Sequence, residues 1–172
     1  MRLFVAAWPS EEVLSSLAAL PRPERPGVRW TQPDQWHVTV RFFGEVTVDE
    51  GVAAGRGVAE AAATAHPVVA DIGPNVGRFG RGVLQVPVAG LEPVAKAMVA
   101  STAEVGAPPD PKPFTGHITL ARSRGKRTLD GLTGAEVRGQ WTVHEVALVA
   151  SLASKRPGVP NHYEVVATFP LG

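Results

Sequence analysis

The chain has 172 residues, of which 44% are hydrophobic and 19% charged, and its net charge is +1. This composition fits a folded globular protein and excludes a disordered chain, which has low hydrophobicity and high net charge. A net charge near zero also excludes a surface coated with basic residues for non-specific nucleic-acid binding. Because the sequence contains no cysteine, disulfide frameworks, thiolate nucleophiles and cysteine zinc sites are excluded as well.

The first nine residues form a short apolar run that ends at a proline, without the long apolar stretch and cleavage site of a signal peptide. No segment reaches the roughly 20 apolar residues that cross a bilayer. We therefore expect a cytoplasmic protein without membrane contact.

The first part of the chain is predicted to contain a buried strand over residues 3–8 and a helix over residues 10–20, with Ser10 as its N-cap. β-Branched and aromatic residues predict a second strand over residues 35–43.

An alanine-rich helix is predicted over residues 49–65, with Asp49 as its N-cap. Two short strands follow, over residues 68–72 and 83–88, and a loop over residues 73–82 joins them.

Apolar residues at helical spacing predict a helix over residues 91–105. Strands are predicted over residues 114–121, 141–151 and 163–169, the last two pairing antiparallel. Because the elements mix without regular βαβ alternation, the fold class is predicted to be α+β with mostly antiparallel sheets.

Two motifs of the same form, HVTV at residues 37–40 and HITL at residues 117–120, begin 80 residues apart. This separation is close to half the chain and suggests an internal duplication. The similarity is short, so the sequence alone leaves the duplication open.

Alternation along a strand places His37 and Thr39 on one face, roughly 6.6 Å apart, and His117 and Thr119 likewise. If the two strands meet, two imidazoles and two hydroxyls face one cleft. Hydrolysis of a cyclic phosphate needs a base to activate water and an acid to protonate the departing oxygen, and histidine suits both roles. The hydroxyls could bind the non-bridging phosphate oxygens, and this chemistry requires no metal.

A single His-x-Thr in a strand is usually structural, but here that explanation would have to hold twice. His66, His144 and His162 show no such pattern and are interpreted as structural or surface residues. The glycine-rich segments 55–57 and 80–82 lack the strand-then-helix context of a phosphate loop, and we interpret them as a helix irregularity and a turn.

The motifs and their flanks, VRW at 28–30, RFFGEV at 41–46 and FTGHITLAR at 114–122, resemble the 2H phosphoesterase superfamily. The nearest likeness is its RNA 2',3'-cyclic phosphodiesterase branch, the LigT-like proteins, also called 2'-5' RNA ligases. RLFVA at 2–6 and ATFPL at 167–171 also resemble that family, so the likeness spans nearly the whole chain.

The resemblance implies a single 2H phosphoesterase domain over residues 1–172 with two intertwined, pseudo-symmetric lobes. Each lobe would have an antiparallel sheet and outer helices, with the active-site cleft between the lobes. It further implies opening of a terminal 2',3'-cyclic phosphate to a 2'-phosphate, with His37 as acid to the ribose 3' oxygen and His117 as base. Thr39 and Thr119 would hold the phosphate.

The implied partner is RNA with a 2',3'-cyclic phosphate end, with tRNA halves among the candidates, and we expect a monomer that uses no cofactor and no metal. Joining of RNA ends through a 2'-5' linkage without ATP, the reverse reaction, is implied as a secondary activity.

For substrate binding, the family implicates an aromatic residue five positions after the first histidine and an arginine five after the second, which are Phe42 and Arg122. Their odd offset puts them on the histidines' face only if both strands bulge, in which case they could sandwich the terminal base. Otherwise Arg41 and Phe43 are the better candidates.

Several further residues near the cleft are of interest. Gly116 stands where many relatives have proline. Basic residues that could hold upstream phosphates, or merely belong to solvated loops, are Arg78, Arg81, Arg124, Lys126 and Arg127.

Three alternatives stay open at this point. The first is an RNA-end binding module without turnover, and the second is a 2H phosphodiesterase that acts on a small cyclic nucleotide. The third is a metallohydrolase with His37 and His117 as ligands, which threonine and the lack of a well-spaced carboxylate disfavour.

Overall fold

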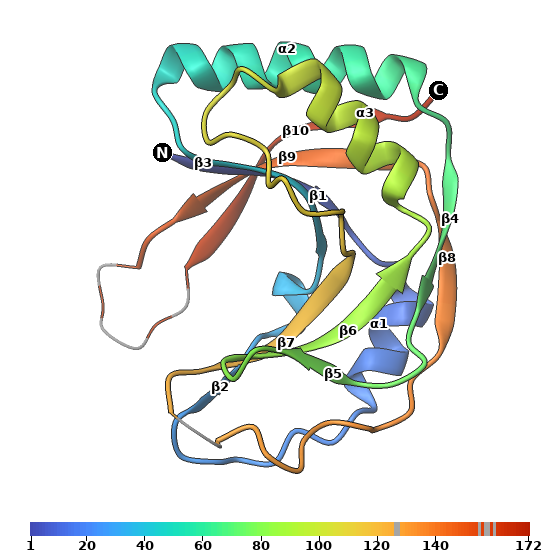
Figure 1. Cartoon of the computed structure of the whole chain (residues 1–172), viewed down its shortest axis with the longest axis vertical. Helices are drawn as coiled ribbons and strands as arrows, with labels where there is room; N and C mark the ends of the chain where they lie inside the picture. Colours follow the sequence, from blue (N-terminus) through green and yellow to red (C-terminus); the bar gives the residue numbers. More distant parts are fainter. Residues whose placement is uncertain (126–127, 155, 157–158, 160) are drawn as a thin grey trace.

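The computed structural model describes residues 1–125, 128–154, 156, 159 and 161–172. Within these residues the chain forms three α-helices, one 3-10 helix and ten strands (Figure 1). In chain order they are β1 (Arg2–Ala7), α1 (Glu11–Ala18), β2 (Val28–Trp30), η1 (Pro33–Gln35), β3 (Val38–Glu45), α2 (Val48–Thr64), β4 (Val68–Ile72), β5 (Gly77–Phe79), β6 (Val83–Ala89), α3 (Glu92–Thr102), β7 (His117–Ser123), β8 (Gly139–Val143), β9 (Glu145–Leu152) and β10 (His162–Pro170).

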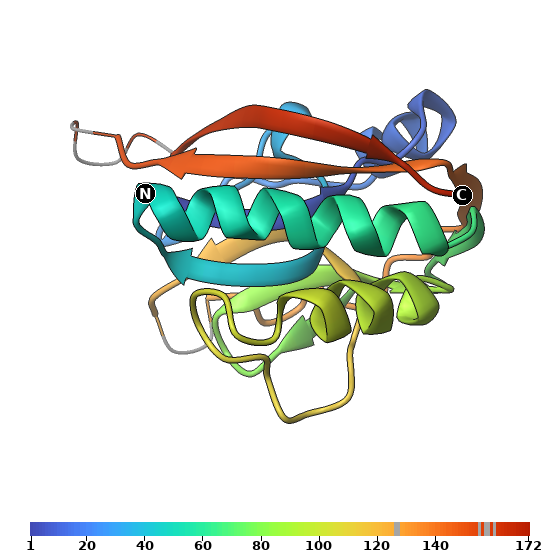
Figure 2. The same cartoon turned by 90° about the horizontal axis from the view of Figure 1, so that it is seen from above.

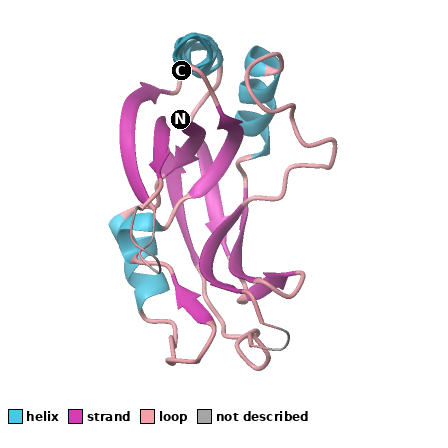
Figure 3. Cartoon of the chain, turned by 90° about the vertical axis from the view of Figure 1, so that its left-hand side faces the viewer, coloured by secondary structure: helices cyan, strands magenta, loops and turns pink. Residues whose placement is uncertain are grey.

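All strand pairings between these elements are antiparallel. The path through the sheet runs β10-β9-β1-β3-β7-β6-β4-β8, with β2 paired to β7 and β5 paired to β6. The sheet is strongly twisted and curled (Figure 3), and the predicted α+β class is confirmed. The path brings β3 and β7, which carry the two motifs, next to each other at its centre.

The helices cover the two ends of this sheet (Figures 1 and 2). At one end α2 and α3 pack against each other, α2 also contacts β9 and β10, and α3 contacts β3. At the other end α1 contacts β8.

Helices α2 and α3 approach each other closely at Gly57, where a Cβ would lie 2.6 Å from the Ser101 carbonyl oxygen. The segment 55–57 is therefore regular helix with a packing role, and its interpretation as an irregularity was wrong.

Several predicted boundaries differ from the structure, and the strand predicted over residues 114–121 begins only at His117. The N-cap of α2 is Thr47, not Asp49, because Thr47 and Glu50 form a reciprocal capping box. The predicted strand 141–151 is two strands, β8 and β9, with His144 between them. The predicted loop 73–82 contains the short strand β5, and its residues 80–82 form the expected turn.

Strand β1 is buried on both faces, which divides the apolar interior into two parts. Leu3, Val5 and Ala7 belong to the main core, which extends over the whole sheet. Phe4 and Ala6 belong to a second cluster with Ala147 and Val149, flanked by the partly buried Trp8 and Tyr163. The second cluster lies under the first motif and forms the apolar support of its histidine. None of the described helices is both long and apolar enough to cross a membrane.

Candidate active site

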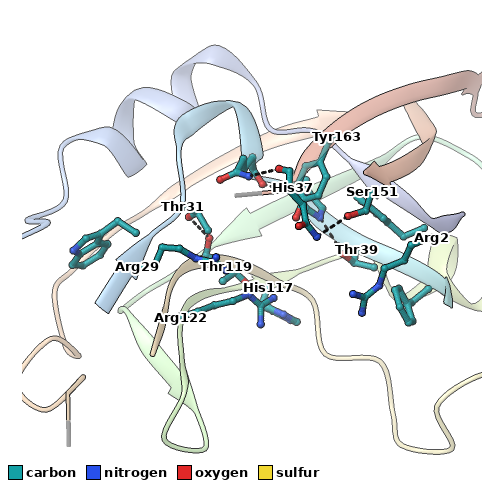
Figure 4. Close-up of a pocket in the computed structure, with 15 residues that line it drawn as sticks. Arg2, Arg29, Thr31, His37, Thr39, His117, Thr119, Arg122, Ser151 and Tyr163 are labelled. Carbon is teal, nitrogen blue, oxygen red and sulfur yellow. Dashed lines mark hydrogen bonds between the residues drawn. The ribbon is translucent and has the colours of Figure 1, made fainter. Parts of the chain in front are cut away.

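A pocket of about 410 Å³ lies where β3 and β7 meet (Figure 4). Both motifs contribute side chains to it, together with residues of β1, β2, η1, β9 and β10. The structure brings all six predicted site residues into its lining, and they are His37, Thr39, Phe42, His117, Thr119 and Arg122.

His37 lies between η1 and β3, not inside a strand that begins at residue 35 as the sequence predicted. Pro33 occupies the first turn of η1, where its missing N–H costs nothing, and the extended backbone resumes only after this turn. From there the expected alternation holds. Val38 and Val40 are buried, whereas His37 and Thr39 are partly exposed and face the pocket.

The tautomer of His37 follows from its hydrogen bonds. Nδ1 lies 2.7 Å from the carbonyl oxygen of Gln35, and because a carbonyl only accepts, Nδ1 carries a proton. In the neutral ring Nε2 is then an acceptor, and the Thr39 hydroxyl donates to it at 3.2 Å. His37 therefore presents Nε2 as its reactive nitrogen.

Three aromatic rings surround the imidazole of His37. Phe4 stacks on it with ring centroids 4.9 Å apart, and Trp8 and Tyr163 meet it edge-on, each at 5.3 Å. We call Phe4, Trp8 and Tyr163 the aromatic nest. It removes water from the ring and fixes its orientation.

Burial in this nest lowers the pKa of His37 to about 4, because an imidazolium there loses its hydration. The hydrogen bond to the Gln35 carbonyl partly opposes this shift, and the nearby positive charges of His117 and Arg122 add to it. His37 is therefore neutral near pH 7 in the free protein.

His117, the first residue of β7, repeats the same local geometry. Its Nδ1 lies 2.9 Å from the carbonyl oxygen of Thr115, again two residues earlier, so Nε2 is its reactive nitrogen too. One aromatic ring, Phe79, packs edge-on against it at 4.6 Å. The preceding Gly116 is required, because a Cβ there would lie 2.4 Å from the Val88 carbonyl oxygen.

Both motif strands contain a bulge three residues after the histidine. Opposite β1, Thr39 pairs with Ala6 and Arg41 with Val5, so Val40 is an extra residue. Opposite β6, Thr119 pairs with Gln85 and Ala121 with Leu84, so Leu120 is extra in the same way. A one-residue bulge reverses the side-chain alternation beyond it.

This reversal turns Phe42 and Arg122 toward the pocket, as their prediction required. The alternative residues face elsewhere. Phe43 is fully buried, and Arg41 is buried with its guanidinium donating to the carbonyl oxygens of Phe42, Thr102, Val105 and Ala107. Arg41 thereby binds the connector after α3 to β3 and has a structural role.

The expected sandwich of one base between Phe42 and Arg122 is not formed. Strands β3 and β7 are antiparallel and pair at Val38 and Ile118. Phe42 lies four residues beyond Val38 and Arg122 four residues beyond Ile118, in opposite directions, at about 3.3 Å per residue. The two side chains are thus on the order of 20 Å apart. Figure 4 agrees, since Arg2, which stacks on Phe42 at 5.0 Å, and Arg122 lie on opposite sides of the histidines.

Among the described residues, three arginines line the pocket and no aspartate or glutamate does. Arg29 and Arg122 are direct cross-strand partners on β2 and β7, an arrangement that like charges disfavour. Arg2 lies at the opposite end on β1. The lining that the structure describes therefore carries positive charge at both ends, which suits an anionic ligand.

Three of the basic residues predicted near the cleft, Arg78, Arg81 and Arg124, are not among those that line it. Arg78 forms an ion pair with Asp130 at 2.9 Å. Lys126 and Arg127 lie outside the described residues.

Sequence reasoning missed Arg2, Phe4, Arg29 and Tyr163. Alternation along β1 could have found the first two, since Leu3, Val5 and Ala7 occupy the main core and leave Arg2 and Phe4 on the other face. Tyr163 comes from the far end of the chain, and only the strand order brings it to His37.

A hydrogen-bonded link joins the two motifs below the pocket. Trp36, which is buried, donates from Nε1 to the Thr31 hydroxyl at 3.0 Å. That hydroxyl lies 2.8 Å from the Thr119 carbonyl oxygen and 2.9 Å from that of Leu120. Thr31 thus connects the residue before His37 to the bulge of the second motif, and Figure 4 shows Thr31 beside Thr119.

The other histidines lie away from this pocket. His66 and His144 are exposed, and His162 is an exposed residue beside a smaller cavity. Within the part of the chain that the structure describes, no group of three or more His, Cys, Asp or Glu side chains gathers closely enough to hold a metal ion.

Comparisons with known proteins agree with this fold. A family model described as "LigT like Phosphoesterase" matches residues 7–72, a segment that contains the first motif. A sequence search finds no match among curated proteins.

Solved structures match over 99% of the chain. The protein TT0787 of Thermus thermophilus is 26% identical, covered over 98% of its length, with a TM-score of 0.77. Escherichia coli LigT in complex with 3'-AMP is 22% identical, covered over 97%, with a TM-score of 0.78. A structure titled simply as a phosphoesterase is 24% identical, covered over 97%, with a TM-score of 0.75.

The chain therefore has the α+β fold of the two phosphoesterase structures that it matches. The match to the LigT-like phosphoesterase model is confined to residues 7–72, and the solved structures, at 22–26% identity, show that the chain shares their fold.

Proposed function

We propose that this protein is a cytoplasmic, metal-independent RNA 2',3'-cyclic phosphodiesterase that leaves a 2'-phosphate, and that it acts as a monomer built as one two-lobed domain. One observation carries the proposal. The two His-x-Thr pairs face one pocket, and each histidine donates from Nδ1 to a carbonyl oxygen two residues earlier, which leaves both Nε2 atoms for chemistry. Two such nitrogens supply the base and the acid of an in-line displacement.

In the proposed reaction, neutral His117 accepts a proton at Nε2 from a water molecule, whose oxygen attacks phosphorus. The bond from phosphorus to the ribose 3' oxygen breaks, and His37 donates a proton from Nε2 to that oxygen. A 3'-hydroxyl and a 2'-phosphate result.

The acid role requires a protonated His37, although its pKa is about 4 in the free protein. The anionic phosphate itself supplies the missing counter-charge. Its negative charge offsets the positive charge of Arg122 and stabilises an imidazolium within reach. Substrate binding thereby raises the pKa of His37 and converts it to the acid.

The groups around the phosphate have distinct tasks in this scheme. The Thr39 and Thr119 hydroxyls donate to the non-bridging oxygens, where negative charge develops, and the arginine side chains at the two ends of the pocket attract the anionic substrate. Phe42 offers a face for base stacking at one end, and Arg122 binds at the other.

The nucleotide complexes of LigT support a nucleotide as the ligand. That protein has been crystallised with 3'-AMP, NADP+, ATP and phosphate. We extend this preference to the present pocket, whose described lining has three arginines and no carboxylate side chain.

Ligation through a 2'-5' linkage is the reverse reaction, with a 5'-hydroxyl of RNA in place of water. Microscopic reversibility permits it at the same two histidines. Water is by far the more concentrated nucleophile, so we rank ligation as a secondary activity, with tRNA halves as candidate substrates.

Incubation with an RNA that ends in a 2',3'-cyclic phosphate, in excess EDTA, tests the proposal. We expect conversion to a phosphate monoester at an unchanged rate with and without chelator. Unchanged substrate at high protein concentration, together with measurable binding of that RNA, would instead indicate an RNA-end binding module. Loss of turnover in EDTA would indicate a metallohydrolase.

A further inference from the structure

A second cavity of about 280 Å³ adjoins the active-site pocket on the side of His37. The two cavities share Gln35, Asn161 and Tyr163 as lining residues. Gln35 donates from Nε2 to the Asn161 carbonyl oxygen at 3.1 Å, and Asn161 donates from Nδ2 to the Ser151 hydroxyl at 3.2 Å. Because the two linings have these residues in common, a ligand that passes them would contact both cavities.

The lining of the second cavity differs in chemistry from that of the first. It contains no arginine or lysine among its described residues, whereas three arginines line the first. It has instead the rings of Trp8, His162 and Tyr163, with the hydrogen-bonding side chains of Asp34, Gln35 and Asn161. Aromatic faces with edge donors and acceptors suit an uncharged heteroaromatic ring, while the carboxylate of Asp34 repels a phosphate.

The second cavity lies on the side of His37 and not on the side of His117. Trp8 and Tyr163, which line it, both pack edge-on against the ring of His37, whereas Phe79 is the ring that contacts His117. If His37 protonates the ribose 3' oxygen, the terminal ribose lies on the side of His37. The RNA strand continues from that ribose in the 5' direction, and the attacking water or 5'-hydroxyl enters from the side of His117.

We propose that the second cavity binds the base of the nucleotide immediately 5' to the cyclic phosphate end, so that the substrate is an RNA oligonucleotide and not a mononucleotide. This inference rests on the proposed function and specifies its substrate class. Stacking on an aromatic side chain contributes about 1–3 kcal/mol per base, which corresponds to roughly a 5- to 150-fold preference.

Strand β10 offers a matched pair of variants for the test. Val165 lines the second cavity and is 51% exposed, whereas Val166 does not line it and is 53% exposed. Val166 is the extra residue of a bulge between Val165 and Ala167 in the pairing with β9. Val165→Trp would place an indole in the cavity, and Val166→Trp adds the same side chain beside it. Neither residue lines the active-site pocket.

The measurement is kcat/KM for a nucleoside 2',3'-cyclic phosphate and for a dinucleotide that ends in one. We expect the wild-type protein to prefer the dinucleotide by about tenfold or more. Val165→Trp should lose that preference and keep the mononucleotide rate, while Val166→Trp keeps both. Thermal melting of the two variants checks that each is folded.

The possible failures are distinguishable. Equal rates for the two substrates, or an undiminished preference in Val165→Trp, would overturn this inference and leave the proposed function intact. Slower ligation in Val165→Trp with unaltered dinucleotide hydrolysis would assign the cavity to the joining strand and also overturn it. No turnover of either substrate by the wild-type protein would overturn the proposed function, and this inference with it.

Discussion

In both motifs the histidine donates from Nδ1 to the carbonyl oxygen two residues earlier, and the strand bulges three residues after it. The surroundings of the two imidazoles differ. His37 lies among three aromatic rings, whereas His117 contacts one, Phe79. The repeated backbone geometry thus points the Nε2 atoms of both histidines into one pocket. Because different numbers of aromatic rings pack against them, the two imidazoles have different environments. Acid and base assignments in one site depend on such differences.

The largest expected effect comes from removing either imidazole. His37→Ala and His117→Ala should each lower kcat/KM on an RNA with a 2',3'-cyclic phosphate end by about 10²- to 10⁴-fold, the usual contribution of general acid or base catalysis. His66→Ala, at an exposed position away from the pocket, is the control. Full activity in either pocket variant would remove that histidine from the mechanism.

The aromatic nest should make stability depend on pH. The unfolded chain binds a proton at His37 below pH 6.5, whereas the folded protein resists it down to about pH 4. This contribution is complete above pH 6.5, and the free energy of unfolding should fall by up to about 3 kcal/mol between pH 6.5 and 4. Urea unfolding at several pH values measures it. His37→Gln should flatten this slope relative to wild type, and an equal slope would contradict the assigned environment.

The link between the motifs should have a smaller effect on stability. Thr31→Val removes the hydroxyl that accepts from Trp36 Nε1 and binds the backbone at the second bulge. Because Trp36 is buried, its N–H would lose its acceptor, at a cost of about 1–3 kcal/mol. Thr31→Ser keeps the hydroxyl and should restore most of that stability, and an equal loss in both variants would attribute the effect to packing.

Phe42 and Arg122, at the two ends of the pocket, should have the smallest effect on kcat/KM when they are replaced. Phe42→Ala and Arg122→Ala should each raise KM for RNA by about tenfold and change kcat less, since each is proposed to bind substrate away from phosphorus. Val69→Ala, an exposed residue outside the pocket, serves as the control. Because the two residues lie at opposite ends, the effects on KM should multiply in the double variant. A double variant no worse than either single one would indicate a shared contact.

Local patterns predicted a large part of this molecule. Alternation within each motif correctly placed Thr39 and Thr119 on the pocket face, because Val38 and Ile118 occupy the core. The bulges could not be located in advance, since their extra residues, Val40 and Leu120, are as apolar as ordinary core residues. The expected sandwich of a base between Phe42 and Arg122 was wrong, because β3 and β7 are antiparallel and place these two residues at opposite ends of the pocket. No local sequence pattern shows how the two strands pair.

Long-range pairing accounts for the rest of what was missed. Arg29 faces Arg122 only because β2 adds to β7, and Tyr163 meets His37 only because β10, β9, β1 and β3 are consecutive in the sheet. The pKa of His37 likewise depends on rings from β1, the turn after it and β10. The sequence contains all the residues of the aromatic nest, but it does not show that they become neighbours of His37 in the fold.

The most direct test of the account is the position of the phosphate in the product. Phosphorus NMR of an RNA oligonucleotide treated with the protein should show its 2',3'-cyclic phosphate converted to a 2'-phosphate, with conversion slowed by about 10²-fold or more in His37→Ala and His117→Ala. A 3'-phosphate would mean that the 2' oxygen leaves, and a persistent cyclic phosphate would mean that the pocket does not catalyse this reaction. Either result would contradict the roles assigned to the two motifs.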